Sequence, residues 1–266
     1  MTIDARIGII GGNGWMGSAI AAAAVNSGVL AAENLTLSGR TQPPAAPELA
    51  AAHWTRDNRE LADKADVIML SVPPQQFADI DIHAAGKLVI SVMAGITVQA
   101  IEASTGADAV VRAIPNAAAA IGQSFTPWFA APAINADDKQ FVRQLFDACG
   151  GSAEVEHESH IDHCVAMTGS GAAYPALLAE ALVAHAVASG LPRDFARRAA
   201  KGVLVNASQL FAGEATDTAD IVQQMIDYGG TTGAALQATR ERGFDAAVAQ
   251  GLQAALDKAA ALGTPK

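Results

Sequence analysis

The chain has 266 residues and a formal net charge of −10 at pH 7; 51% of its residues are hydrophobic and 5% are aromatic. This length can bury one large hydrophobic core or two moderate ones. The acidic balance argues against a protein that binds nucleic acid through its phosphates. Two cysteines, Cys149 and Cys164, are too few for a disulfide framework and indicate a cytoplasmic protein with reduced thiols.

The N-terminal residues, 1–6, lack the basic and apolar regions of a signal peptide. The longest apolar stretches also fall well short of the ~18 residues expected of a membrane span. We therefore expect a soluble protein with no membrane partner.

Clustered glycines follow the first apolar run, at residues 7–10, and lead into a helix of small residues. Gly12, Gly14 and Gly17 have the spacing G-x-G-x-x-G, with Gly11 as one extra glycine at the end of the strand. Residues without Cβ let the backbone approach a pyrophosphate, and the N-terminus of the following helix offers free N–H groups to an anion. The alternative is a purely structural strand-to-helix turn, which the position between a strand and a helix makes the weaker interpretation. The sequence therefore predicts a dinucleotide site at Gly12, Asn13, Gly14, Trp15, Met16 and Gly17.

A helix predicted over residues 18–27 leads to a second strand, predicted over residues 35–38. An acidic residue after this strand would hydrogen-bond the ribose 2′-hydroxyl of NAD, whereas an arginine accommodates the 2′-phosphate of NADP. Here Ser38 ends the strand, Arg40 follows, and no carboxylate is close behind. Ser38 and Arg40 therefore join the predicted cofactor site, with NADP(H) preferred over NAD(H). The alternative for Arg40 is a solvated loop cation.

Three further apolar strands follow a proline-rich loop at residues 43–47. They are predicted over residues 66–72, 87–92 and 110–116, with a short helix over 58–64 before the first of them. Strands that alternate with helices predict a doubly wound parallel sheet, a Rossmann-type α/β domain, and ligands bind beyond the carboxyl ends of such strands. The residues at these ends are therefore predicted to contact the cofactor: Val72, Pro73, Ala94, Gly95 and Asn116.

Strand signals end after a last candidate strand at residues 152–156, and the second half of the chain is predicted to be helical, with breaks at Gly190 and Gly213. The predicted domains are a dinucleotide-binding domain over residues 1–157 and an all-helical domain over residues 158–266. A short helical domain rich in alanine commonly completes its core against a second subunit. The candidate helices cover residues 159–167, 174–189, 193–212, 218–225 and 233–262.

His157, His160 and His163, together with Cys164, have a spacing that resembles metal ligands on a helix. A repeat of three residues drifts around a helix, however, and does not focus four ligands on one zinc ion. Acidic neighbours favour a solvated face at this position, so no metal site is predicted.

Short motifs follow one another in a specific order and spacing along the chain, at residues 90–97, 112–116, 169–174, 190–192 and 229–232. Together they resemble the pyrroline-5-carboxylate reductase family over nearly the whole length. The resemblance implies a Rossmann domain followed by a helical dimerisation domain. It also implies an enzyme of proline biosynthesis in which NAD(P)H reduces the C=N bond of 1-pyrroline-5-carboxylate to give proline. The family forms homodimers or larger homo-oligomers, with each active site between the cofactor domain of one subunit and helices of another.

The same resemblance implies a substrate site at residues 229–232, where the family has a turn that opens a helix and receives the substrate carboxylate. By this analogy the hydroxyl of Thr232 lies near the imine nitrogen and orients it or helps to protonate it. Free N–H groups at a helix N-terminus suit a carboxylate, and imine reduction needs positioning without a covalent nucleophile or a metal. The alternative for Thr231 and Thr232 is simple capping of the last helix. The implied substrate residues are Asp227, Gly229, Gly230, Thr231 and Thr232, with Thr232 as the catalytic residue.

The chain departs from the family pattern at four places. Asp-Tyr at 227–228 replaces Ser-Pro, Ala-Ala at 117–118 stands where Thr-Pro is common, and Pro-Pro at 73–74 replaces Lys-Pro. The glycine loop is one residue longer and resembles that of prephenate dehydrogenases. Asp227 places a negative charge beside the carboxylate site unless it turns away, or it pairs with an amine or iminium. The alternatives are therefore a reductase of another cyclic imine or ketimine, or a catalytically silent paralogue that binds NADPH.

Overall fold

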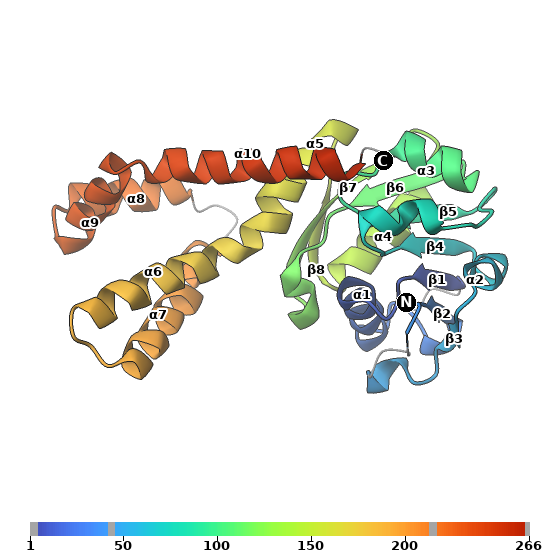
Figure 1. The fold of residues 1–266 in the computed structure, drawn as a ribbon, viewed down its shortest axis with the longest axis horizontal. Helices are drawn as coiled ribbons and strands as arrows, with labels where there is room; N and C mark the ends of the chain where they lie inside the picture. The colour runs from blue at the N-terminus through green and yellow to red at the C-terminus, as the bar shows by residue number, and fades with distance from the viewer. Residues whose placement is uncertain (1–4, 42–45, 213–216, 264–266) are drawn as a thin grey trace. The chain divides into compact units, whose positions relative to one another are not determined.

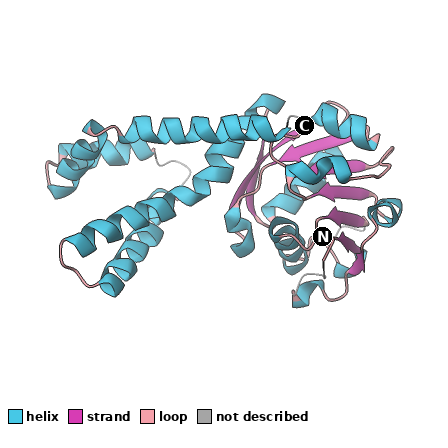
Figure 2. Cartoon of the chain, in the orientation of Figure 1, coloured by secondary structure: helices cyan, strands magenta, loops and turns pink. Residues whose placement is uncertain are grey.

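A computed structural model describes residues 5–41, 46–212 and 217–263 of the chain. The chain folds into two compact units: the sheet unit, residues 1–172 and 254–266, and the helical unit, residues 173–253. All strands of the described residues belong to the sheet unit, and the described part of the helical unit is built from helices (Figures 1 and 2). The predicted domain boundary after residue 157 lies before this division, at the start of a helix that continues out of the sheet unit.

The sheet unit contains one sheet, in which the described residues form eight strands in the order β3-β2-β1-β4-β5-β6-β7-β8. Strands β1 to β6 pair in parallel, and β7 pairs antiparallel with β6. The prediction of a doubly wound, mainly parallel sheet is confirmed, but β7 and β8 run opposite to the other strands. The strands are β1 Ile7–Ile10, β2 Leu35–Ser38, β3 His53–Thr55, β4 Val67–Leu70, β5 Leu88–Ser91, β6 Ala109–Ala113, β7 Ser124–Ala130 and β8 Gly150–Glu154.

Alternate residues of the central strands enter two hydrophobic cores, one on each face of the sheet. Ile7 and Ile9 of β1 belong to one core, and Ile10 belongs to the other. The residues of β4 divide between the two cores in the same way. A strand that is buried on both faces needs apolar residues at every position, which explains why the sequence shows continuous apolar runs here.

Helices cover both faces of this sheet (Figure 1). The helices α1 and α4 pack on one face, whereas α2 and α3 pack on the other. The side chains of Asp57, Thr97 and Asn135 accept hydrogen bonds from the first backbone N–H groups of α2, α3 and α4, respectively. No side chain caps α1, so its first N–H groups stay available to a ligand. The bounds are α1 Trp15–Asn26, α2 Asn58–Lys64, α3 Val98–Thr105 and α4 Ala136–Asp147.

A buried arginine connects the sheet to α5 (Glu158–Cys164), the helix that leads out of the sheet unit. Arg112 of β6 is 1% exposed, and its guanidinium donates hydrogen bonds to Glu158 (2.7 Å) and Asp162 (2.8 Å). Glu158 also accepts a hydrogen bond from the backbone N–H of Val98, at the start of α3. Pairing makes the buried charge tolerable. This network therefore joins β6, α3 and α5.

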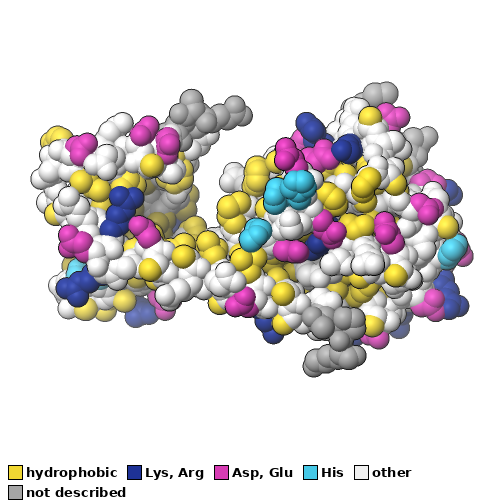
Figure 3. Space-filling model, turned by 90° about the horizontal axis from the view of Figure 1, so that it is seen from above, with side chains coloured by type: hydrophobic (Ala, Val, Ile, Leu, Met, Phe, Trp, Pro, Cys, Tyr) yellow, Lys and Arg dark blue, Asp and Glu magenta, His cyan; other side chains and the backbone are white. Residues whose placement is uncertain are grey.

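The helical unit has almost no core of its own. Among its described residues only Ala196, Ala200 and Gly233 are buried. Large apolar side chains such as Leu177 and Leu210 are 62% and 71% exposed, and hydrophobic side chains are visible on its surface in Figure 3. A surface of this kind requires a covering partner. The helices are α6 Tyr174–Ala188, α7 Arg193–Ala207, α8 Thr218–Asp227, α9 Thr231–Glu241 and the first part of α10 Phe244–Gly263.

Residues 158–188 form a helical stretch that is long and apolar enough to cross a membrane by length and composition, with a mean hydropathy of 1.3. None of the residues in the most apolar window of this stretch is buried. The prediction that no apolar stretch is long enough to cross a membrane missed this helix. A helix that another protein chain covers passes the same test, so this finding alone does not indicate a membrane protein.

Several predicted elements differ from the structure. The helix predicted over residues 233–262 is divided into α9 and α10, because Gly243 adopts φ +88° and ends α9. The helix predicted over 193–212 ends at Ala207 and continues as a single tight turn. The break at Gly213 and residues 1–4 lie outside the described residues, and the loop at 43–47 is described only from residue 46.

Candidate functional site: a dinucleotide pocket and an open helix N-terminus

The carboxyl ends of the parallel strands meet at one edge of the sheet. The loops that follow five of these strands carry the residues predicted to hold the cofactor. Asn13 follows β1, Arg40 follows β2, Pro73 follows β4, Gly95 follows β5 and Asn116 follows β6. The parallel topology therefore brings the predicted residues to the edge at which open α/β sheets bind ligands.

The glycine loop between β1 and α1 lies so close to its neighbours that side chains would not fit. Gly11 has φ +85°, and a Cβ there would collide with the carbonyl of Ser71. A Cβ on Gly17 would lie 2.6 Å from the Gly11 carbonyl oxygen. The backbone N–H of Gly12 donates to the carbonyl of Ser38 (2.9 Å), which fixes the loop to the end of β2. The loop is therefore tight, and it leaves the uncapped N-terminus of α1 open at the sheet edge.

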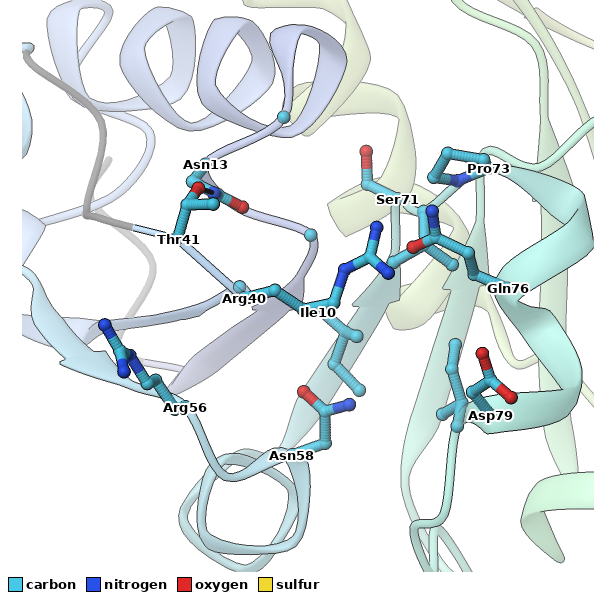
Figure 4. Close-up of a pocket in the computed structure, with 15 residues that line it drawn as sticks. Ile10, Asn13, Arg40, Thr41, Arg56, Asn58, Ser71, Pro73, Gln76 and Asp79 are labelled. Atoms are coloured by element: carbon cyan, nitrogen blue, oxygen red, sulfur yellow. Dashed lines mark hydrogen bonds between the residues drawn. The ribbon is translucent and has the colours of Figure 1, made fainter.

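A pocket of about 360 Å³ lies beside this loop, within the range of about 300–1,000 Å³ that is typical of small-molecule sites (Figure 4). It adjoins the start of α1, whose free N–H groups suit the pyrophosphate of a dinucleotide. The pocket is thus compatible with the cofactor that the glycine spacing predicts. The predicted residues that line it are Asn13, Gly14, Arg40, Val72 and Pro73.

Other predicted cofactor residues support the pocket without lining it. Gly12 and Gly17 are buried in the packing of the loop. Ser38 is also fully buried, and its hydroxyl donates to Oδ1 of Asn58 (2.7 Å). Trp15 and Met16 are the first residues of α1, and neither lines the pocket. Their contact with the cofactor stays a prediction.

The loops after β5 and β6 lie outside this pocket. Gly95, which follows Ala94, has φ +78°, and a Cβ there would overlap the carbonyl of Ala259 in the last turns of α10. The side chain of Asn116 accepts a hydrogen bond from the backbone N–H of Ala118 (2.9 Å) and so begins a short helical turn. Both loops are held in place, and their role toward the nicotinamide stays a prediction.

Polar residues that the sequence analysis did not single out also line the pocket. Arg56 comes from the turn between β3 and α2, and Asn58 is the first residue of α2; Figure 4 shows both on the wall opposite Gln76 and Asp79. No sequence signal identifies them, because β3 has only three residues and gives no recognisable strand pattern. The full set of these residues is Thr41, Arg56, Asn58, Ser71, Gln76 and Asp79.

Hydrogen bonds fix the turn between β3 and α2. The side chain of Asp57 caps α2, and its backbone N–H donates to the hydroxyl of Thr55 (3.1 Å). That hydroxyl in turn donates to the carboxylate of Glu60 (2.5 Å). Hydrogen bonds from Lys64, Thr55 and His53 lower the pKa of Glu60 from its ordinary value of 4.5 to about 2, so the anion is the stable form. The residues on this turn therefore have a well-defined backbone position.

The turn between α8 and α9 presents an open helix N-terminus in the helical unit. Gly229 adopts φ +70°, and Gly230 is the N-cap residue of α9. Thr231 and Thr232 are the first residues of α9, but no side chain caps this helix. The structure therefore does not support the alternative in which these threonines cap the helix. The first backbone N–H groups of α9 donate to no capping side chain.

Asp227 is the last residue of α8, immediately before this turn. Its carboxylate accepts a hydrogen bond from Nε2 of Gln223, one helical turn earlier (2.7 Å). The side chain therefore lies along α8 and is engaged there. Tyr228 is 88% exposed and fills no internal space. A Cβ on Gly233 would lie 2.7 Å from the carbonyl oxygen of Met225, so α8 and α9 pack closely and hold the turn.

The histidines of α5 and the residue before it do not assemble a metal centre among the described residues. The rings of His157 and His160 contact each other edge to face, with centroids 5.0 Å apart. A group of histidine side chains is visible at the surface of the sheet unit (Figure 3). This arrangement agrees with a solvated face.

A doubly wound sheet, a tight glycine loop and a pocket that contains arginine together define a Rossmann-type dinucleotide-binding protein with an added helical unit. Comparison with known proteins agrees with this class. Residues 6–95 match the family described as "NADP oxidoreductase coenzyme F420-dependent", and residues 158–262 match "Pyrroline-5-carboxylate reductase dimerisation".

Relatives and solved structures extend over the whole chain. The pyrroline-5-carboxylate reductase of Synechocystis sp. is 31% identical over 265 residues, which cover 97% of this chain and 98% of the relative. The structure of a pyrroline-5-carboxylate reductase from Coxiella burnetii is 27% identical, with a TM-score of 0.84 and coverage of 99% and 100%. The Plasmodium falciparum pyrroline carboxylate reductase, solved with NADP bound, shares the fold at 24% identity, with a TM-score of 0.83 and coverage of 99% and 100%.

The chain belongs to the pyrroline-5-carboxylate reductase family, as its motifs indicate. It is an oxidoreductase that uses a nicotinamide cofactor and acts on the C=N bond of a small molecule. The match to a dimerisation domain indicates a homo-oligomer and accounts for the exposed apolar surface of the helical unit.

Proposed function

We propose that this protein reduces 1-pyrroline-5-carboxylate to proline with NADPH. The observation that carries the proposal is the uncapped N-terminus of α9 at Gly230–Thr232, in a chain that also forms a dinucleotide pocket at the edge of its sheet. The nicotinamide supplies the hydride when the cofactor is bound. The residues of this chain then have to bind the imine and orient its carbon toward the donor.

The α9 N-terminus is suited to the substrate carboxylate. Its first backbone N–H groups carry the positive end of the helix dipole and lack a capping side chain. We assign carboxylate binding to Gly230 and Thr231, and orientation or protonation of the imine nitrogen to the hydroxyl of Thr232. Gly229, whose backbone N–H donates to the carbonyl of Ile226 (3.0 Å), shapes the turn before them. By analogy with the family, this turn acts on the cofactor domain of another subunit, so the functional unit is a homodimer or a larger homo-oligomer.

NADPH is proposed as the cofactor because the loop after β2 carries Arg40 and no carboxylate follows it closely. A carboxylate there would bind the ribose hydroxyls of NAD and would repel a 2′-phosphate. The free thiols Cys149 and Cys164 agree with a cytoplasmic location.

A second candidate substrate is a cyclic imine without the carboxylate. Asp227 stands where the family has serine, and its negative charge lies next to the proposed carboxylate site in the sequence. Its hydrogen bond to Gln223 holds the side chain along α8, which favours the carboxylated substrate. The charge remains within a few residues of the site, so a measurable repulsion is expected.

A comparison of two imines tests both candidates. We expect faster NADPH oxidation with 1-pyrroline-5-carboxylate than with 1-pyrroline, which lacks the carboxylate. Asp227→Ser should lower KM for the carboxylated imine about threefold, because a like charge at a hydrated surface contributes less than about 1 kcal/mol. KM for 1-pyrroline should not change.

Asp220→Ser, on an exposed position of the same helix, is the matched control and should leave both KM values unaltered. Brisk turnover of 1-pyrroline beside little turnover of the carboxylated imine would establish the second candidate. An unchanged KM in Asp227→Ser would remove Asp227 from substrate binding.

A further inference from the structure

Two arginines of the dinucleotide pocket have no internal partner. Arg40 and Arg56 both line the pocket, and neither side chain forms a hydrogen bond or ion pair with any residue that the structure describes. By contrast, Arg59, three residues after Arg56, is paired with Asp81. In a chain with a net charge of −10, two unpaired cations in one pocket indicate a place where an anion binds.

The backbone that carries each arginine is fixed by its neighbours. On the β2 side, the amide of Asn13 donates to the hydroxyl of Thr41 (2.5 Å), and the same amide packs against Gly39. On the β3 side, Asp57 and Thr55 fix the turn, as described above. The next pocket residue, Asn58, is held by the buried hydroxyl of Ser38. The two segments are thus tied to the same strand end, with Arg40 on one and Arg56 on the other.

The side chains leave room between these segments. Figure 4 shows Arg40 extending across the pocket toward Ser71 and Gln76. Arg56 lies on the β3 side, on the same side of the view as Thr41 and opposite Gln76 and Asp79. Asp79, the acidic residue among those that line the pocket, is on the opposite wall from Arg56. The Thr41 side of the pocket therefore carries Arg56 and lies away from Asp79 in this view, and the exposed Arg40 side chain is not held elsewhere by a hydrogen bond or ion pair with the described residues.

A phosphate monoester has a second pKa of about 6 and carries a charge of about −1.5 to −2 at neutral pH, so one guanidinium neutralises only part of it. In a Rossmann-type pocket, the 2′-phosphate of NADP lies beyond the end of the second strand. Here that position is the Gly39–Thr41 segment, with Arg56 on the neighbouring turn.

We infer that Arg56 is a second 2′-phosphate ligand that acts with Arg40 and makes the enzyme select NADPH over NADH. The inference rests on the proposed NADPH preference and adds a specificity-determining residue to it. It assigns the selectivity to a turn between β3 and α2, which lies outside the loop after β2 that usually decides it.

Binding measurements with the full-length protein test the inference without an imine substrate. Calorimetry would compare NADPH with NADH, and adenosine 2′,5′-bisphosphate with 5′-AMP. Arg56→Gln should weaken the binding of NADPH and of the bisphosphate about tenfold, the loss expected for one charge-assisted hydrogen bond, and leave NADH and 5′-AMP unchanged. Arg56→Lys should recover part of the loss. Higher salt should narrow the difference between wild type and Arg56→Gln, since the interaction is electrostatic.

Arg59→Gln is the control, because it removes a nearby paired arginine that does not line the pocket, and its NADPH to NADH ratio should equal that of the wild type. If the wild type prefers NADPH and Arg56→Gln keeps the same ratio, the inference is overturned and the proposed function stands. If the wild type binds NADH as well as NADPH, the proposed cofactor preference fails, and the inference fails with it. Equal weakening of all four ligands in Arg56→Gln would show a structural role only and would also overturn the inference.

Discussion

Gly95 and Gly86 have nearly the same backbone conformation and different surroundings. Alanine substitutions at the two positions therefore separate the cost of backbone strain from the cost of steric overlap. Both adopt positive φ, +78° and +73°, which disfavours any residue with a Cβ. At Gly86 there is open space, whereas a Cβ on Gly95 would overlap the Ala259 carbonyl in α10. Gly86→Ala should therefore lower the free energy of unfolding by about 1 kcal/mol. Gly95→Ala should lower it by about 2 kcal/mol more, because the end of α10 must shift.

Urea unfolding of the two variants measures this difference. A larger loss for Gly95→Ala would show that the last turns of α10 are packed against the loop after β5. Equal losses in the two variants would contradict that packing.

At the scale of residues, the sequence predicted the groups that a short motif specifies and missed those that the fold assembles. The glycines between residues 11 and 17 were recognisable because their spacing has one dominant structural use. Arg56 and Asn58 reach the same pocket from the turn after a three-residue strand and from the start of α2, and only the pairing of β2 with β3 places them there. Ser38 was predicted as a cofactor residue, but it is buried and supports Asn58 instead of lining the pocket.

At the scale of elements, an ion pair joins the starts of the two central strands. Arg6 precedes β1 and Asp66 precedes β4; the carboxylate of Asp66 accepts hydrogen bonds from the guanidinium Nη2 (2.6 Å) and from the backbone N–H (3.1 Å) of Arg6. These bonds lower the pKa of Asp66 from its ordinary value of 3.8 to about 2. The folded state therefore binds this proton more weakly than the unfolded state does.

The sign of the pH dependence follows from this lowered pKa. The stabilisation is fully present above about pH 4 and is lost as the pH falls through about 2. Because Asp66 is half exposed, its contribution should be no more than about 1 kcal/mol. Asp66→Asn should remove this contribution at neutral pH and flatten the decline in stability between pH 4 and pH 2. Denaturant midpoints across that range would measure it.

Asp63→Asn is the matched control, since the Asp63 side chain is exposed and makes no hydrogen bond or ion pair with the described residues. It should leave the acid limb of the curve unchanged. A decline in Asp66→Asn as steep as in the wild type would exclude this carboxyl from the acid response.

The elements that the sequence predicted well are those with one strong local signal. The central strands β1, β4 and β5 are continuous apolar runs because both of their faces are buried. β7 was missed, since it contains Pro127 and polar residues and is formed through its pairing with β6 and β8. The division of the last helix at Gly243 was also missed, because a single glycine within an apolar helical pattern is often tolerated.

At the scale of the whole molecule, the two units differ in what stabilises them. The sheet unit buries two cores of its own, one on each face of the sheet. The helical unit buries only three of its described residues and matches a dimerisation domain, so we expect its stability to depend on a second copy of the chain. The sequence predicted a core completed by a second subunit, because the helical domain is short and its helices are rich in alanine. It could not predict which residues of two subunits meet, because that arrangement depends on packing between chains.

The central claim is that hydride passes from NADPH to the imine carbon of 1-pyrroline-5-carboxylate. The most direct test uses NADPH that carries deuterium at the transferred position of its nicotinamide ring, with proline analysed by mass spectrometry and NMR. We predict proline with a single deuterium on the δ carbon, the former imine carbon, in an amount equal to the NADPH oxidised. Binding of NADPH without any labelled proline would contradict the claim. If NADPH were then also not oxidised with 1-pyrroline, the chain would be a catalytically silent member of its family.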